Sequence, residues 1–173
     1  MERLAQRLGR DLGAEDISVV PIGGAHAAGN FLRRVGPRGL GLEVAGLCDA
    51  REEAHFERAL EGAGMGSDLT REDMERLGFY TCVEDLEDEL IRCLGVPAVE
   101  RVLAAEGDLA SFRKFQSQPA QLDRPIDAQL RRFMGTRAGR KAKYARVLVD
   151  ALDLSRIPRP LAGVLGHLRV GGP

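Results

Sequence analysis

Apolar positions in the first 95 residues change repeatedly between two spacings. Leu4, Leu8 and Leu12 recur every four residues, which is typical of one face of a helix. Short, nearly continuous apolar runs that end in glycine or acidic residues are typical of strands in a parallel sheet. These two patterns predict helices over residues 1–12, 25–35, 52–60, 70–77 and 86–94, and strands over residues 17–22, 42–48 and 79–83.

Helices and strands that alternate with short connections predict parallel strands joined by right-handed crossovers. This pattern ends at Gly95-Val-Pro97, and the rest of the chain shows only helical patterns and a proline-containing loop. We therefore predict an α/β fold in which a small Rossmann-like parallel sheet flanked by helices occupies residues 1–95. Residues 96–173 are predicted to form a basic helical extension packed on this core, with helices over residues 98–106, 126–133, 139–152 and 160–168 and a loop over residues 116–125.

The composition excludes several classes of protein. A hydrophobic fraction of 44% and a net charge of -1 argue against disorder. No apolar stretch approaches the roughly 20 residues that span a bilayer, and the charged start of the chain is unlike a signal peptide. Cys48, Cys82 and Cys93 are too widely spaced for a disulfide framework or a zinc site. We expect a cytoplasmic protein with reduced thiols and no membrane partner.

The near-zero net charge conceals two halves of opposite sign. Residues 1–110 contain 22 acidic and 12 basic residues, whereas residues 111–173 contain 4 acidic and 13 basic residues. Such asymmetry indicates partners that meet one half of the chain and not the other. An acidic half is suited to cations and a basic half to phosphates.

Each predicted strand is followed by residues that could form part of a binding site: two glycines after the first strand and acidic residues after the other two. Because parallel strands present their carboxyl ends at one sheet edge, acidic groups after two strands would repel each other unless a cation lay between them. Oxygen ligands of this kind suit Mg²⁺ or Mn²⁺. The alternative is that the acids stabilise helix N-termini, and this alternative is favoured for all of them except Asp49 and Glu87. The strand ends carry the turn Gly23-Gly24, then Asp49, Glu52 and Glu53, then Glu84, Asp85 and Glu87.

The basic half contains a run of residues in which every charged side chain is positive. Sixteen residues hold seven cations and no acid, which indicates a polyanion such as a phosphodiester backbone, or else the chain's own acidic half. Lys141 is also suited to holding a scissile phosphate. Tyr144 is predicted to pack in the core, and the three histidines are scattered singly. The cations are Arg131, Arg132, Arg137, Arg140, Lys141, Lys143 and Arg146.

The order of these motifs resembles the Toprim domain at the C-terminal end of OLD-family ATP-dependent endonucleases, also described as a Toprim nucleotidyl transferase/hydrolase domain. The resemblance covers nearly the whole chain and implies a metal-binding parallel sheet that acts on phosphodiester bonds. Asp49 matches the first acid of the family's Asp-x-Asp motif, and Glu87 matches its later metal-binding glutamate. Lys141 matches the lysine of the terminal Lys-x-x-aromatic-Ala helix.

Two departures from the family pattern bear on function. Arg51 stands at the second acid of Asp-x-Asp, with Glu52 or Glu53 as stand-ins. The family's opening strand and its Glu-Gly motif have no counterpart, so the chain is either an internal start within a longer protein or a shortened remnant. A sheet edge without its neighbour favours association with another chain, including a homo-oligomer.

The first hypothesis is therefore a Mg²⁺- or Mn²⁺-dependent nuclease domain with Asp49, Glu87 and Lys141 as its catalytic residues. DNA is favoured over RNA as substrate, and the resemblance implies an ATPase domain or partner. The alternative is a degenerate nucleic-acid-binding or protein-interaction module without catalysis. A receiver-like signalling domain ranks last, because it gives no reason for the basic helices.

Overall fold

The computed structural model describes residues 1–137 and 139–168 and divides the chain into two compact units. Residues 1–85 form the first unit together with the segment that begins at Arg159, and residues 86–158 form the second. This division lies earlier than the boundary near Gly95 expected from the sequence. The physical reason is the helix that starts at Leu86, which packs against later helices of the second unit.

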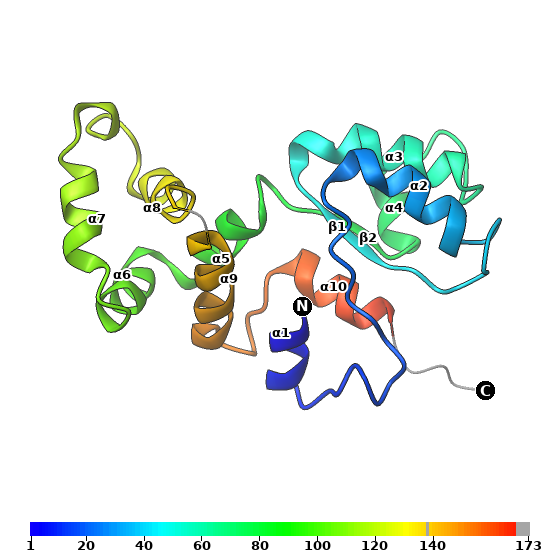
Figure 1. The fold of residues 1–173 in the computed structure, drawn as a ribbon, viewed down its shortest axis with the longest axis horizontal. Coiled ribbons are helices and arrows are strands. Elements are labelled where there is room, and N and C mark those ends of the chain that lie inside the picture. The colour runs from blue at the N-terminus through cyan, green and yellow to red at the C-terminus, as the bar shows by residue number, and fades with distance from the viewer. Residues whose placement is uncertain (138, 169–173) are drawn as a thin grey trace. The chain divides into compact units, whose positions relative to one another are not determined.

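The first unit is built around two short parallel strands (Figure 1). Gly46, Leu47 and Cys48 pair in register with Phe79, Tyr80 and Thr81. The elements of this unit are α1 (Glu2–Arg7), α2 (Ala25–Val35), β1 (Gly46–Cys48), the 3₁₀ turn η1 (Ala50–Glu52), α3 (Glu53–Gly62), α4 (Arg71–Arg76), β2 (Phe79–Thr81) and α10 (Arg159–His167).

A local capping box fixes the start of α4, and a distant arginine caps the end of α10. Thr70 accepts a hydrogen bond from the backbone of Asp73, whose carboxylate accepts one from the Thr70 backbone, so the predicted capping box is confirmed. Arg10 donates hydrogen bonds to the carbonyls of Leu165 and Leu168, at the C-terminal end of α10. A cation stabilises this negative end of the helix dipole and ties the start of the chain to its last helix.

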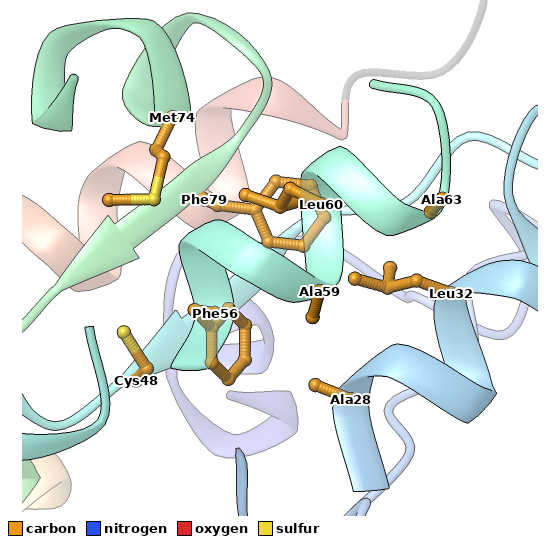
Figure 2. Close-up of a cluster of buried hydrophobic side chains, with 9 residues drawn as sticks. All are labelled: Ala28, Leu32, Cys48, Phe56, Ala59, Leu60, Ala63, Met74 and Phe79. Atoms are coloured by element: carbon orange, nitrogen blue, oxygen red, sulfur yellow. The ribbon is translucent and has the colours of Figure 1, made fainter. Parts of the chain in front are cut away.

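The core of the first unit lies between α2, α3, α4 and the strands (Figure 2). Phe56 and Phe79 are at its centre, with ring centroids 6.2 Å apart. Gly46 on β1 allows this contact, because a Cβ there would lie 2.7 Å from Phe79 Cδ1 and 3.4 Å from Phe56 Cε1. The buried cluster comprises Ala28, Leu32, Cys48, Phe56, Ala59, Leu60, Ala63, Met74 and Phe79.

The predicted strand over residues 17–22 is wrong. Within the described residues, the sheet has only β1 and β2, and the segment has no regular structure. Val19 and Val20 are 41% and 52% exposed, and Pro21 has no N–H to donate to a ladder. The predicted strand over residues 42–48 is shorter than expected, because only Gly46–Cys48 lies beside β2.

The second unit is entirely helical over its described residues. Tyr144, Leu90, Leu103, Phe112 and Leu130 are buried in it, so the predicted core position of Tyr144 is confirmed. The apolar spacing did not predict α7, but the other helices begin within two residues of their predicted starts. The elements are α5 (Leu86–Leu94), α6 (Val96–Ala105), α7 (Leu109–Gln116), the 3₁₀ turn η2 (Pro119–Gln121), α8 (Ile126–Met134) and α9 (Arg140–Ala151).

None of the helices described here has the length and apolar character needed to cross a membrane.

Replacing Gly46 with alanine is expected to lower the free energy of unfolding by about 1–3 kcal/mol, because the added methyl group must displace two buried aromatic rings. Gly62→Ala is the matched control: the new Cβ meets no atom within 4 Å, at the end of α3. Urea denaturation of the two variants checks the prediction. Equal stability of both variants would contradict the packing described for Gly46.

Candidate functional site

The carboxyl ends of β1 and β2 lie side by side in the first unit, as the parallel arrangement predicts. The Ala50 N–H donates to the Glu84 carbonyl at 3.1 Å, which joins the backbone segments that follow the two strands. Asp49 follows β1 directly and precedes η1, and its carbonyl accepts the Glu52 N–H at 2.9 Å. The structure thus holds Asp49 and Glu52 in a short turn at the carboxyl edge of the sheet.

This edge of the sheet has a negative field. Burial raises the pKa of the Cys48 thiol to about 11, and the nearby charges of Glu53, Glu52 and Asp49 add to the rise. The side chain of Glu53, however, already has a partner. The Arg71 Nε donates to its Oε1 at 2.8 Å and a second guanidinium N–H donates to Oε2, which lowers the pKa of Glu53. Arg71 therefore neutralises Glu53 at this edge of the sheet.

Gly23 and Gly24 form the turn before α2, where both have positive φ values of 76° and 109°. A Cβ on Gly24 would lie 3.8 Å from Glu52 Oε1, so the predicted glycine turn and the acidic turn after β1 are neighbours.

The structure also brings together two histidines that are scattered singly in the sequence. His26 of α2 and His55 of α3 meet edge to face, with ring centroids 4.7 Å apart. Their separation in the sequence gave no signal of this contact.

In the second unit, Glu87 and Lys141 meet. Glu87, on α5, is buried, and its Oε2 lies 3.0 Å from Nζ of Lys141, on α9. The Lys141 side chain is 59% exposed, so it connects a buried carboxylate to solvent. The two atoms form a charge contact without hydrogen-bond geometry, and no other described residue donates a hydrogen bond to this buried oxygen. Both residues were predicted as catalytic from separate parts of the sequence.

Asp108 neutralises another part of the predicted basic surface. It accepts hydrogen bonds from Tyr144 Oη at 2.8 Å and from a guanidinium N–H of Arg140 at 3.2 Å. Arg140 is buried, with its guanidinium carbon 4.1 Å from the centroid of the Phe133 ring. Lys143 Nζ lies 2.8 Å from Glu106 Oε2. Arg140 and Lys143 therefore meet acids of residues 1–110, the intramolecular alternative that the sequence left open.

The remaining predicted nucleic-acid contacts lie on α8, on α9 and between them. Arg132, Arg137 and Arg146 are exposed, and Arg131 is half-buried. These four arginines stay at the surface together with Lys141 and Lys143, which are exposed although each is paired with an acid, whereas Arg140 is buried. The prediction that they contact nucleic acid stays a prediction.

The described residues do not form a complete metal centre. No group of three or more His, Cys, Asp or Glu side chains among them is placed to hold a metal ion. The predicted ligands fall in both units, Asp49, Glu52 and Glu53 in the first and Glu87 in the second. The carboxylate oxygens of Asp49, Glu52, Glu53 and Glu87 are of the type that Mg²⁺ and Mn²⁺ bind.

No family model and no curated protein matches this sequence. Solved structures do: the chain is similar to the C-terminal region of the OLD protein of Xanthomonas campestris pv. campestris, in structures phased with mercury, iodine and platinum. The TM-scores are 0.65, 0.66 and 0.69 at 20%, 21% and 19% identity. Each match covers 96% of this chain and 84–86% of the other. The likeness shows that the two proteins share a fold.

Asp108→Asn is expected to lower the free energy of unfolding at pH 7 by about 1.5–3 kcal/mol, since it leaves the buried Arg140 without its anion. The Tyr144 hydrogen bond and the Arg140 charge hold the pKa of Asp108 below its ordinary value of 3.8. The contribution of the ionised Asp108 carboxylate to the free energy of unfolding is therefore fully present above pH 3.8. This contribution is lost as the pH falls through the lower pKa that Asp108 has in the folded state.

Urea denaturation between pH 2 and pH 7 measures this dependence. The variant is expected to lose less stability than the parent protein as the pH falls. Asp123→Asn, at an exposed acid of the same unit, is the control, and its stability should stay within about 0.5 kcal/mol of the parent. A destabilisation of Asp108→Asn no larger than that of the control would contradict the role given to Asp108.

Proposed function

We propose that this chain is a Mg²⁺- or Mn²⁺-dependent domain of the Toprim type that cleaves or transfers phosphodiester bonds. The observation that carries the proposal is the contact between Glu87 and Lys141, two residues predicted as catalytic that come from helices distant in the sequence. The fold shared with the OLD C-terminal region supports the same function. DNA is the favoured substrate.

The two residues have complementary roles in this proposal. Lys141 presents a partly exposed ammonium group that binds a non-bridging phosphate oxygen as a point charge. Glu87 holds that ammonium group in place, because its buried carboxylate attracts the opposite charge 3.0 Å away. When phosphate binds Lys141, the buried Oε2 of Glu87, which accepts no hydrogen bond from a described residue, can serve as an anionic ligand.

Asp49 and Glu52 are the carboxylates of the first unit on which the activity depends. Mg²⁺ keeps several waters and takes one or two carboxylates together with substrate phosphates, so it does not require a prebuilt cage of three side chains. When bound, such an ion supplies charge at the phosphate oxygens and a more acidic water. Glu53 would have to exchange Arg71 for the metal ion before it could join this set.

Glu87→Gln and Asp49→Asn are expected to lower the rate of Mn²⁺-dependent cleavage of a supercoiled plasmid by about 100-fold or more, in line with the loss of one charge-stabilising group. The matched control is Glu89→Gln, which removes a buried carboxylate from the same helix; Glu89 pairs with Arg92 at 2.8 Å. The control is expected to retain cleavage. Gel electrophoresis measures the rates, and thermal unfolding shows that each variant is folded.

Two results would overturn the nuclease assignment. One is cleavage that proceeds at the parent rate in both Glu87→Gln and Asp49→Asn. The other is an equal loss of cleavage in Glu87→Gln and Glu89→Gln at equal melting temperatures, because α5 would then act only as a scaffold.

A second candidate function is nucleic-acid binding without catalysis. The specific observation in its favour is that the described residues form no three-ligand metal group, while exposed arginines remain on α8 and α9 and between them. Under this alternative, binding to DNA survives Asp49→Asn and Glu87→Gln, and no cleavage is detected with either metal.

If the exposed arginines contact phosphates, neutralising Arg132, Arg137 and Arg146 to glutamine should weaken DNA binding and lower the slope of log affinity against log salt by about 2–3. Arg140→Gln is the informative comparison: because Arg140 is buried beside Asp108, it should reduce stability rather than the salt slope. Fluorescence anisotropy with a labelled duplex at several salt concentrations measures both. A salt slope unchanged in the triple variant would contradict a phosphate-binding role for these three residues.

A further inference from the structure

His26 and His55 place two imidazole rings side by side at the first turns of α2 and α3. Their ring centroids lie 4.7 Å apart, and the ring planes meet at 78°. His26 is exposed and His55 is half-buried, so a solute can reach the pair. Neither ring belongs to the carboxylates and the lysine proposed for phosphodiester chemistry.

The packing of α2 against α3 holds this pair. Ala28 of α2 and Ala59 of α3 are buried on the facing helices in the core of the first unit (Figure 2). A Cβ on Gly29 would lie 3.9 Å from the Cβ of Ala59, so small residues let the two helices approach closely. These contacts lie about one turn beyond the histidines on each helix. The backbone positions that carry the two imidazoles are therefore preorganised.

The spacing of the rings fits two ligands of one metal ion. With metal–nitrogen bonds of about 2.0–2.1 Å, two imidazoles on one ion have centroids roughly 4.5–6 Å apart at nitrogen–metal–nitrogen angles of about 90–140°. The observed separation of 4.7 Å lies within this range. Because the ring torsion of histidine is broad, both rings can turn toward a common ion while the helices stay in place.

The charge around the pair also favours a cation. Asp49, Glu52 and Glu53 contribute negative charge at the turn before α3. Oε1 of Glu52 lies 3.8 Å from the Cβ position of Gly24, which is two residues before His26. These carboxylates offset the positive ends of the two helix dipoles, which alone would disfavour a bound cation.

Imidazole nitrogens select a different class of metal from carboxylates. Mg²⁺ and Mn²⁺ prefer oxygen ligands, whereas imidazole suits Zn²⁺, Cu²⁺ and Ni²⁺. We propose that His26 and His55 bind one ion of this second class through one nitrogen of each ring, with water or an anion completing the coordination. The site is open and has two protein ligands, in keeping with the absence of a three-residue metal group among the described residues. It needs neither Glu87 nor Lys141, so it is independent of the function proposed above.

The test uses Cu²⁺ and the full chain without a histidine tag, in a Cys93→Ser background that removes a half-buried thiol able to compete for copper. One equivalent of Cu²⁺ is expected to bind, and electron spin-echo spectroscopy should show two coordinated imidazoles. His26→Gln and His55→Gln should each lower the copper affinity about tenfold or more, since loss of even an indirect partner of a metal costs that much. Each variant should leave one imidazole on the ion.

The controls separate this site from other ligands. His167→Gln is the matched control, because the third histidine lies on α10 against Gly78, and the copper affinity should be unchanged. Neither Asp49→Asn nor an excess of Mg²⁺ should change the number of imidazoles bound to copper. Copper should also raise the melting temperature of the parent protein but not that of His26→Gln, because the ion joins α2 to α3.

Three results would overturn the proposal. The first is bound copper without two coordinated imidazoles, or no bound copper, because the two rings then make an aromatic contact only. The second is equal copper affinity in His26→Gln and the parent protein. The third is release of copper by Mg²⁺ or by Asp49→Asn, because the ion then lies on the carboxylates. Copper held by both rings supports the site even in a protein that cleaves no DNA, so failure of the nuclease assignment is distinguishable from failure of this one.

Discussion

The parallel pairing of β1 with β2 is the constraint on which the first unit depends. Three residue pairs hold the strands together, and Gly46 leaves room for the Phe79 and Phe56 rings beside the backbone of β1. The pairing also decides where chemistry can occur, because it brings the backbone after β1 beside the backbone after β2. The same two strands place Asp49 in a defined turn.

The second unit depends instead on the neutralisation of buried charge. Arg140 and Tyr144 both meet Asp108, so the start of α9 is fixed by one carboxylate on the loop before α7. Glu87 and Lys141 form a second pair of opposite charges in this unit. Here the carboxylate is buried, but the Lys141 side chain is more exposed than that of Arg140. Charges buried in this way contribute less to stability than to position, since a hydrophobic replacement often stabilises a core equally well. They specify which residue of α9 faces which helix.

Sequence patterns predicted the helices well, because apolar spacing and capping residues such as Thr70 are local signals. They also predicted that Asp49 follows a strand, whereas the placement of Glu87 and Lys141 in one site came from the family resemblance. The strand predicted over residues 17–22 failed because a strand depends on a partner, and composition alone cannot show whether one is present. The contact of His26 with His55, and the pairing of Arg140 with Asp108, result from tertiary packing between distant helices. No spacing rule identifies such pairs.

The hydrogen bonds from Arg10 to the end of α10 give the chain an order of assembly. The first unit is discontinuous: residues 86–158 are inserted between β2 and the helix that completes it. During synthesis from the N-terminus, β1 and β2 therefore emerge well before α10. The hydrogen bonds of Arg10 to the carbonyls of Leu165 and Leu168 can form only after residues 86–158 have been synthesised. The inserted unit is continuous and can fold first. Its folding brings its own two ends to fixed positions, and this lowers the entropy cost of closing the first unit around α10.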